Sequence, residues 1–304
     1  MRAVGGVEYW RSCSHRVSAK LGRAGLDVDD VQRVISLALG EDLRYGPDAT
    51  TDATVPREAV AEADLNPRKG GVLAGVVVAL AVFDTVIGAE NYEVLELRKD
   101  GEKLSPGESA LRLRGPVRGL LTAERTALNL VCHLSGVATA TAAWVDAVNG
   151  TGCVVRDSRK TMPGVRLLQK YAVRCGGGEN HRLGLGDAVL IKDNHVVAAG
   201  GVVQALKLAR QHAPHLPCEV EVTSLEELDL VLGEQASLVL LDNFTPEQCA
   251  EAVRRAAGTG TKLEASGGLT LDVAREYAET GVDYLAVGGL THSSPALDLG
   301  LDLR

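Results

Sequence analysis

The chain has few aromatic residues, 3% of its 304 residues, and it carries no surplus of positive charge, since its formal net charge at pH 7 is −8. Proteins that bind nucleic acid broadly present a cationic face, and many stack bases on aromatic side chains. This composition therefore argues against a nucleic-acid partner. The chain also lacks any uninterrupted apolar run of about 18 residues, which a membrane-spanning helix needs, so we expect no membrane partner.

The six cysteines are scattered along the chain, with no C-x-x-C pair and no regular spacing. They are Cys13, Cys132, Cys153, Cys175, Cys218 and Cys249. This pattern predicts reduced thiols in a cytoplasmic protein rather than a disulfide or zinc framework. The first 25 residues are basic but lack the apolar core of a secretory signal. We therefore expect residues 1–25 to be a mobile N-terminal extension.

Glycine is abundant, with 34 residues, and hydrophobic side chains make up 45% of the chain, enough to form a large core. In the first part of the chain, short strand-like runs separated by Asp-Gly and Pro-Gly turns predict an antiparallel sheet with helices on one side. We expect strands at 61–65, 91–98 and 108–115, and helices from Asp29 or Asp30 to 39, near 76–88, and over 120–148 with a break near Gly136. This part of the chain is predicted to be an α/β sandwich.

After Gly150 the pattern changes, because buried strand-like runs alternate with amphipathic helices. The expected strands are 153–158, 188–194, 218–223, 238–243, 262–267 and 284–289, and the expected helices are 202–212, 224–232, 246–257 and 272–280. Such alternation predicts a parallel sheet with right-handed crossovers. Six strands, with one more upstream, suit an incomplete α/β barrel. A doubly wound open sheet is the alternative.

Reactive polar residues stand at the end of nearly every expected parallel strand. They are Asp157 to Lys160, Lys192 to His195, Glu219 and Glu221, Asp242 and Asn243, Glu264 to Gly268, and Gly288 and Gly289. Ligands of parallel α/β folds bind beyond the carboxyl ends of the strands. A charged residue in a buried strand is costly unless it is paired, so its repetition at one end indicates a site. Ordinary loop entry is the plainer explanation for any single residue.

Local charge and glycine content indicate which ligands this site takes. From Arg156 to Lys192 there are eight Lys/Arg and three Asp/Glu, whereas from Glu219 to Asp242 there are seven Asp/Glu and no Lys/Arg. Glycine pairs at 267–268 and 288–289 let backbone N–H groups approach a phosphate, with Ser266 and His292 alongside. Glu221 and Asp242 can take Mg²⁺ or the hydroxyls of a sugar, unless they form a solvated rim.

The cationic residues are the most specific feature. Arg159, Lys160, Arg182 and Lys192 come from two successive strand–helix connections, with His181 beside Arg182. An Arg fork binds a carboxylate through two hydrogen bonds, so several of them indicate a substrate with more than one carboxylate. A surface charge run is the alternative, and it is disfavoured because these residues follow apolar strands.

At these residues the chain resembles a known family. The segment DSRKTMPGVRLLQKYAVRCGGGENHRLGLGDAVLIKDNH (157–195) is closely similar to quinolinate phosphoribosyltransferase, the carboxylating nicotinate-nucleotide pyrophosphorylase. Further similar segments follow in the family's order, at 41–56, 70–75, 120–129, 219–228, 238–244, 263–270 and 284–298. The resemblance implies an α/β sandwich (26–118), an incomplete α/β barrel of about seven strands (119–292), and a C-terminal segment (293–304) that packs back on the sandwich.

The resemblance also implies an activity. Quinolinate and phosphoribosyl pyrophosphate would give nicotinate mononucleotide, CO2 and pyrophosphate, with magnesium (Mg²⁺) as cofactor, in a cytoplasmic homodimer that serves NAD biosynthesis. Two alternatives stay open. The first is a related phosphoribosyltransferase that acts on nicotinate or another anionic base. The second is an anion-binding barrel without catalysis.

Residue roles also follow from the resemblance. Quinolinate would contact Arg159, His181, Arg182 and Lys192, together with Arg125 of the neighbouring subunit, which the residue pattern alone would place on a helix surface. Phosphoribosyl pyrophosphate would contact Lys160, Glu221, Asp242, Ser266, Gly267, Gly288, Gly289 and His292. Glu221 and Asp242 would also bind the metal, directly or through water. Lys160, Lys192, Glu221 and Asp242 would be the catalytic residues.

Overall fold

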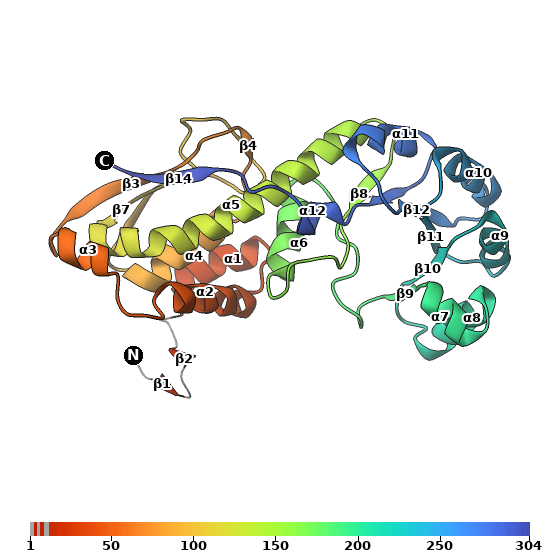
Figure 1. The fold of residues 1–304 in the computed structure, drawn as a ribbon, viewed down its shortest axis with the longest axis horizontal. Coiled ribbons are helices and arrows are strands. Elements are labelled where there is room, and N and C mark those ends of the chain that lie inside the picture. Colours follow the sequence, from red (N-terminus) through yellow and green to blue (C-terminus); the bar gives the residue numbers. More distant parts are fainter. Residues whose placement is uncertain (1–2, 5–6, 9–11) are drawn as a thin grey trace. The chain divides into compact units, whose positions relative to one another are not determined.

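The structure, a computed structural model, describes residues 3–4, 7–8 and 12–304. The chain divides into two units, each of which mixes helices with strands (Figure 1). Unit 1 holds the described residues up to Ala140, with Met162–Gly177 and Ser293–Arg304, and unit 2 holds Thr141–Thr161 and Gly178–His292. Unit 1 therefore takes in part of the range expected for the barrel, 119–292.

An antiparallel four-stranded sheet forms one layer of unit 1, in the order β14-β3-β7-β5. Its strands are β3 (Val60–Pro67), β5 (Glu93–Leu97), β7 (Leu111–Pro116) and β14 (Leu299–Leu303). Side chains alternate along β7, where Leu111 and Leu113 are buried and Arg114 is exposed. That period of two is what a sheet with one covered face requires. The three strands expected at 61–65, 91–98 and 108–115 are confirmed.

Helices supply the other layer of unit 1. They are α1 (His15–Arg23), α2 (Val28–Asp42), α3 (Ala49–Thr54), α4 (Val76–Ile87), α5 (Val117–Val148) and α6 (Arg166–Cys175). Two short pairs complete the described strands, β1 (Ala3–Val4) with β2 (Val7–Glu8) and β4 (Gly71–Val72) with β6 (Lys103–Leu104). The helix expected near 76–88 is α4, and nearly all of its side chains are buried. An apolar helix of this kind suits the centre of a core.

Two expectations for the N-terminal region are corrected. Helix α2 begins after Asp27, whose carboxylate accepts a hydrogen bond from the Asp30 amide at 3.0 Å, so neither Asp29 nor Asp30 is the cap. Within the expected mobile extension, residues 15–23 form α1, and Val17 on this helix is fully buried. The buried Asp84 accepts hydrogen bonds from the amide and hydroxyl of Ser14, which fastens the start of α1.

Helix α5 is continuous through Gly136, so the expected break is wrong. A Cβ atom at Gly136 would overlap the carbonyl oxygen of Pro295 and lie 2.8 Å from the Cα of Ala296. The glycine therefore lets the C-terminal segment approach the helix. By length and composition α5 could cross a membrane. Its buried residues, Val131 and Leu134 among them, pack within the protein, as in the core helix of a soluble fold.

Unit 2 is built on a parallel six-stranded sheet in the order β8-β13-β12-β11-β10-β9. Its strands are β8 (Val154–Arg156), β9 (Val189–Ile191), β10 (Cys218–Val222), β11 (Leu238–Asp242), β12 (Lys262–Ser266) and β13 (Tyr284–Ala286). From β9 to β13 each strand pairs with the next in sequence, and β8 pairs with β13 at the far edge, so the order never reverses. That order excludes a doubly wound sheet and describes a barrel left open between β8 and β9.

The expectation of about seven strands needs a small correction. The parallel sheet has six strands within 12–304, and the position beyond β8 is taken by one parallel bridge between Arg156 and Glu179. The amide of Glu179 donates to the Val155 carbonyl at 2.9 Å, and the Asp157 amide donates to the Glu179 carbonyl at 3.2 Å. The segment around Glu179 therefore pairs with β8 at a single residue and does not form a seventh strand.

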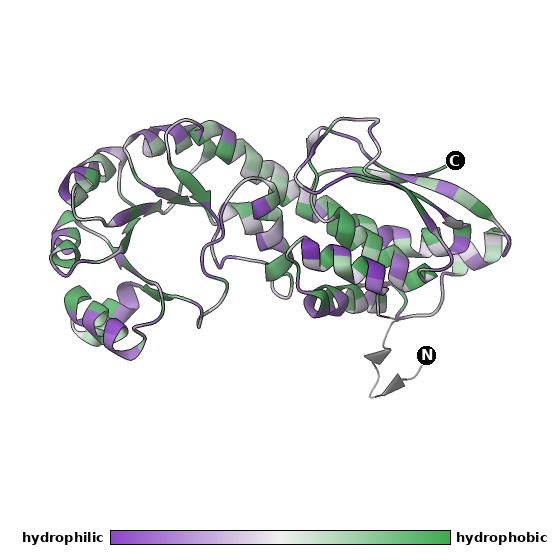
Figure 2. Cartoon of the chain, turned by 180° about the vertical axis from the view of Figure 1, so that it is seen from behind, coloured by the Kyte–Doolittle hydropathy of each residue, from purple (hydrophilic) through white to green (hydrophobic). Residues whose placement is uncertain are grey.

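Helices lie along the outer side of the curved sheet of unit 2 (Figure 1). The helical elements of this unit are α7 (Asp193–Ala199), α8 (Val202–His212), α9 (Leu225–Gly233), α10 (Pro246–Ala256), a 3-10 turn (Leu271–Val273), α11 (Ala274–Glu279) and α12 (Gly289–His292). Figure 2 shows hydrophilic and hydrophobic residues mixed on them, as amphipathic helices on a sheet require. Ser224 and Thr245 cap α9 and α10, whereas Asp272 lies inside the 3-10 turn.

Candidate active site

A pocket of about 610 Å³ lies within unit 2, and the turns that follow the parallel strands line it. Every residue expected to contact a substrate, except Arg125, lies in its wall. These residues are Arg159, Lys160, His181, Arg182, Lys192, Glu221, Asp242, Ser266, Gly267, Gly288, Gly289 and His292. The register of the sheet explains why they meet. Asp242 pairs with Ser266, Ser266 pairs with Ala286, and Ala286 pairs with Arg156. The carboxyl ends of these four strands therefore share one edge of the sheet.

Two arginines give the pocket its positive wall. The Nε atoms of Arg159 and Arg182 are buried, and neither has a hydrogen-bond partner among the described residues. One guanidinium nitrogen of Arg182 donates weakly to the Ala188 carbonyl, at 3.3 Å. Burial, followed by the positive charge of Arg159, lowers the pKa of Arg182. Two half-buried cations that repel one another and have buried, unused Nε–H groups form a receptor for an anion with more than one charge.

Two carboxylates come from the neighbouring strands β10 and β11. Glu221 is buried and accepts a hydrogen bond from the Lys192 ammonium at 2.8 Å, so Lys192 is paired with this acid. Asp242 is half-buried, and its carboxylate accepts from the Asn243 side chain at 2.9 Å. These oxygen atoms suit a sugar hydroxyl or a hard cation such as Mg²⁺, which usually takes one or two protein carboxylates together with substrate phosphates.

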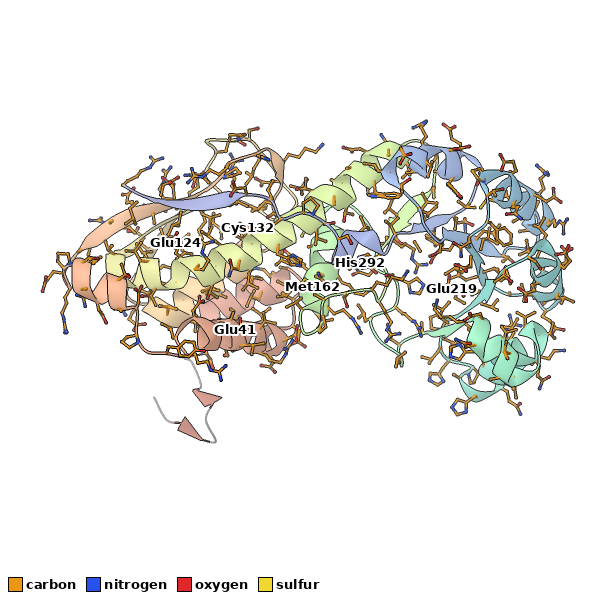
Figure 3. The ribbon with its side chains drawn as sticks, in the orientation of Figure 1. Glu41, Glu124, Cys132, Met162, Glu219 and His292 are labelled. Carbon is orange, nitrogen blue, oxygen red and sulfur yellow. The ribbon has the colours of Figure 1, made fainter. Side chains whose placement is uncertain are left out.

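Glycine is required at two turns of the pocket. Gly267 has a φ of 101°, and a Cβ atom there would overlap the side chain of Asn243. A Cβ atom at Gly288 would lie 2.8 Å from the Lys160 side chain and 3.5 Å from Nε2 of His292. Without side chains at these positions, the backbone can come close to a ligand oxygen. His292 is exposed (Figure 3).

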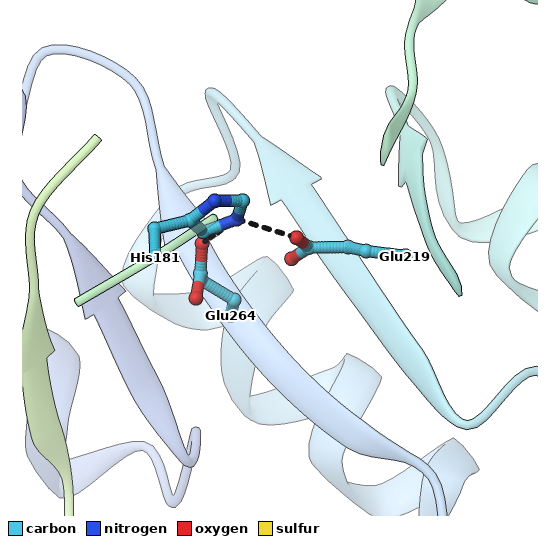
Figure 4. Close-up of side chains that lie close together, drawn as sticks. All are labelled: His181, Glu219 and Glu264. Carbon is cyan, nitrogen blue, oxygen red and sulfur yellow. Dashed lines mark hydrogen bonds and ion pairs between the residues drawn. The ribbon is translucent and has the colours of Figure 1, made fainter. Parts of the chain in front are cut away.

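His181, Glu219 and Glu264 form a buried polar cluster next to this wall (Figure 4), and Arg156 contacts it. Of these four residues, only His181 has a role predicted from the sequence. Nε2 of His181 lies 2.6 Å from a carboxylate oxygen of Glu219 and 3.6 Å from one of Glu264. The other oxygen of Glu264 accepts from the Arg156 guanidinium at 2.7 Å. Burial, and then the negative charge of Glu219, raise the pKa of Glu264 to about 7. Glu219 lies among the strands of unit 2 (Figure 3).

A signal for these residues was present in the sequence. Charged residues within strands that are otherwise apolar mark the inward face of a barrel. In the sequence, Glu219 and Glu264 stand at expected strand ends without an assigned role, and Arg156 stands within the expected strand 153–158. Arg125, by contrast, belongs to unit 1, where it is exposed on α5. Its expected role across a dimer interface stays a prediction.

The open barrel, the cationic pocket and the glycine turns define a barrel enzyme that handles phosphate and carboxylate groups. Residues 48–135 match the family model of the N-terminal domain of quinolinate phosphoribosyl transferase, and residues 137–302 match that of its C-terminal domain. The chain therefore belongs to the quinolinate phosphoribosyltransferase family. This result confirms the resemblance found in the sequence.

Individual relatives agree. The chain is 58% identical over 279 residues to the carboxylating nicotinate-nucleotide pyrophosphorylase of Mycobacterium leprae, covering 91% of this chain and 98% of the relative. It is 42% identical over 256 residues to the human protein of that name, with 83% and 85% covered. The solved nicotinate-nucleotide pyrophosphorylase of Francisella tularensis superposes with a TM-score of 0.86 at 39% identity, covering 91% of this chain and 96% of that one. The incomplete α/β barrel is thus confirmed as the fold.

Proposed function

We propose that this protein transfers the phosphoribosyl group of phosphoribosyl pyrophosphate to quinolinate with decarboxylation. The products are nicotinate mononucleotide, CO2 and pyrophosphate, and the step belongs to NAD biosynthesis. The observation that carries the proposal is a pair of half-buried arginines, Arg159 and Arg182, whose buried Nε–H groups lack partners among the described residues. Quinolinate has two adjacent carboxylates, so each of the two guanidinium groups can bind one of them. Nicotinate has one carboxylate and would leave one guanidinium without an anionic partner.

The quinolinate site consists of Arg159 and Arg182, with Lys192 beside them. Lys192 is held by Glu221 at 2.8 Å, and it can turn toward a substrate carboxylate because its side chain is 47% exposed. We include His181 in this site because it lines the pocket. Both of its ring nitrogens, however, already have protein partners.

The phosphoribosyl pyrophosphate site occupies the glycine turns. Ser266, Gly267, Gly288, Gly289 and His292 would bind the 5′-phosphate, since backbone N–H groups at glycines approach anions closely. Lys160 would lie against the pyrophosphate. Lys160 is exposed, and its own backbone carbonyl accepts a hydrogen bond from the Thr291 hydroxyl at 2.8 Å. This hydrogen bond joins the Lys160 turn to the start of α12.

Glu221 and Asp242 would serve the ribose hydroxyls and a Mg²⁺ ion, directly or through water. Their fit to Mg²⁺ rests on donor type, two carboxylates on adjacent strands at the rim of the pocket, which is the small protein ligand set that Mg²⁺ shares with substrate phosphates. When bound, the ion would supply positive charge to the departing pyrophosphate.

The residues of the chain would act by position and charge. The pyridine nitrogen donates its electron pair to C1 of the ribose, and the C1–O bond breaks with its pair leaving on pyrophosphate. Glu221 and Asp242 favour the positive charge that develops on the ribose, and Lys160 stabilises the charge on the leaving group. The bond from ring carbon C2 to its carboxylate then breaks, CO2 leaves, and the electron pair on C2, next to the charged nitrogen, takes up a proton.

We further propose a cytoplasmic homodimer in which Arg125 of each subunit completes the other subunit's quinolinate site. Two observations support this proposal. Arg125 is exposed on α5. All six cysteines, which lie within the described residues, are free thiols, as suits a reducing compartment.

The function is tested by incubating the protein with quinolinate, phosphoribosyl pyrophosphate and Mg²⁺ and separating the products by chromatography. We expect nicotinate mononucleotide and pyrophosphate from quinolinate, and loss of both when EDTA is added. Product from nicotinate but not from quinolinate would replace the proposal by the related-transferase alternative. Failure to release pyrophosphate with either base would favour an anion-binding barrel without catalysis.

A further inference from the structure

Both ring nitrogens of His181 have protein partners. Its Nδ1 accepts a hydrogen bond from the backbone amide of Arg182 at 2.8 Å, and an atom that accepts from an amide carries no proton of its own. Nε2 therefore holds the ring proton and donates it to Glu219 at 2.6 Å, with Glu264 at 3.6 Å as a second acceptor. The ring is buried, with 8% of its surface exposed. His181 is thus a link between a buried carboxylate pair and the backbone of Arg182.

The carboxylate pair is itself held in place. Glu264 is fully buried, and the Arg156 guanidinium that donates to it lies 4.5 Å above the Tyr284 ring. Two carboxylates against one guanidinium leave an excess of negative charge, which a shared proton relieves. The raised pKa of Glu264 agrees with this, since burial and the charge of Glu219 both favour its protonated form. The cluster is therefore an acceptor for the Nε2 proton of His181.

The segment that carries Arg182 depends on side chains for its position. Glu179 makes only one bridge to β8, and residues 178–188 form no helix or longer strand. Asp157, which is fully buried, accepts from the His181 amide at 2.9 Å and from the Asn180 side chain at 2.7 Å. Beyond them, Asp187 accepts from the amides of Leu183 and Gly184. The backbone of Arg182 itself is held by the hydrogen bond from its amide to the His181 ring, and its guanidinium donates weakly to the Ala188 carbonyl.

We propose that Arg156, Glu219 and Glu264 are positioning residues for substrate binding. They fix the orientation and the tautomer of His181, and His181 fixes the backbone of Arg182, whose guanidinium takes a carboxylate of the substrate. His181 on this account also positions Arg182. The inference rests on the proposed function, because it concerns the dicarboxylate site. It extends that site from the pocket wall to residues in the interior of the barrel.

A bound metal ion is a different explanation for the same atoms. One ligand atom from each of His181, Glu219 and Glu264 lies within 4.8 Å of the others, which is a spacing that a cation can bridge. The observations favour the hydrogen-bonded network, because Arg156 already supplies a positive charge to Glu264 and Nε2 of His181 already shares a proton with Glu219. A cation would have to displace that proton.

The test measures binding of phthalate, a ring with two adjacent carboxylates and no ring nitrogen, by titration calorimetry. Glu219→Ala should weaken phthalate binding about tenfold, the order expected when a hydrogen bond to a charged group is lost. Glu219→Gln should restore affinity to within about threefold of the wild type, because its amide oxygen can still accept from His181. Binding of ribose 5-phosphate, which uses the glycine turns, should not change in either variant. Glu276→Ala, an exposed glutamate of α11, is the matched control.

The route through Arg182 is tested in a second background. If Glu219 acts only through Arg182, Glu219→Ala should add no further loss of phthalate affinity to Arg182→Ala. A full additional loss, an unchanged phthalate affinity in Glu219→Ala, or equal losses for phthalate and ribose 5-phosphate would overturn the inference. So would a stoichiometric metal ion that the wild type retains and Glu219→Ala lacks. A wild type that binds phthalate but makes no nicotinate mononucleotide would reject the proposed function alone, since the binding experiment still decides the inference.

Discussion

Replacing Arg159 with alanine should separate stability from substrate binding. In the free protein the Nε–H of Arg159 is buried without a partner among the described residues. The positive charge of Arg159 also lowers the pKa of the neighbouring Arg182, after the larger effect of burial. Removing Arg159 therefore takes away a cost of folding, so the melting temperature should stay the same or rise. With substrate present the same change removes a charged donor, which typically costs about 10²–10³ in rate, or about 2.7–4 kcal/mol of transition-state stabilisation.

The assay compares kcat/KM for quinolinate with thermal unfolding of the free protein. Arg254→Ala is the control, because Arg254 pairs with Glu251 on the surface of α10 and its loss should change neither quantity. The reasoning would be refuted if Arg159→Ala lowered the melting temperature by several degrees and kcat/KM only in proportion. Arg159 would then be a residue that supports the fold rather than one that receives the substrate.

Three further predictions concern other parts of the molecule. Gly288→Ala should raise KM for phosphoribosyl pyrophosphate with little effect on KM for quinolinate, because its Cβ would lie 2.8 Å from the Lys160 side chain; equal changes in both constants would contradict the assignment of this turn. Glu264→Gln should remove a fall in stability that the wild type shows as pH rises toward 7, measured by denaturant unfolding at several pH values. Gly136→Ala should destabilise the protein by about 1–3 kcal/mol through overlap with Pro295, whereas Gly40→Ala in α2, with open space around it, should stabilise it by about 0.5–1 kcal/mol.

The sign of the Glu264 prediction follows from proton binding. The folded protein holds a proton on Glu264 up to a pKa of about 7, whereas the unfolded chain releases it near its ordinary value of 4.5. The stabilising contribution is therefore complete below the unfolded pKa and is lost as pH rises through the folded pKa. Glutamine cannot titrate, so the difference between the two proteins should appear between these values. A constant difference across that range would show that Glu264 has an ordinary pKa.

The pocket wall could be predicted from sequence because it depends on local rules. A parallel strand brings its carboxyl end to a shared edge, and a polar residue just after an apolar run must lie there. The alternation of strands and helices after Gly150 was therefore enough to bring together Arg159, Lys192 and Asp242, and glycine pairs indicated the phosphate turns. The same rules identified every strand of the parallel sheet.

The interior of the site could not be predicted in this way. His181 meets Glu219 and Glu264 only after the barrel has formed, because their separation in sequence is set by whole strand–helix units. The spacing of these residues carries no sign that they are in contact. Gly136 is a similar case, since a glycine stands within this unbroken helix because Pro295 and Ala296, far along the chain, approach it closely. Long-range packing decides both, and local propensity does not.

The most direct test of the account uses quinolinate labelled in its 2-carboxylate. The account predicts that labelled CO2 appears only when phosphoribosyl pyrophosphate is present, in equal amounts with nicotinate mononucleotide and pyrophosphate. Quinolinate labelled in its 3-carboxylate should release no labelled CO2 and should pass its label to the mononucleotide. Labelled CO2 in the absence of phosphoribosyl pyrophosphate, or a mononucleotide that keeps both carboxylates, would contradict the claim that transfer to the ring nitrogen drives decarboxylation in this pocket.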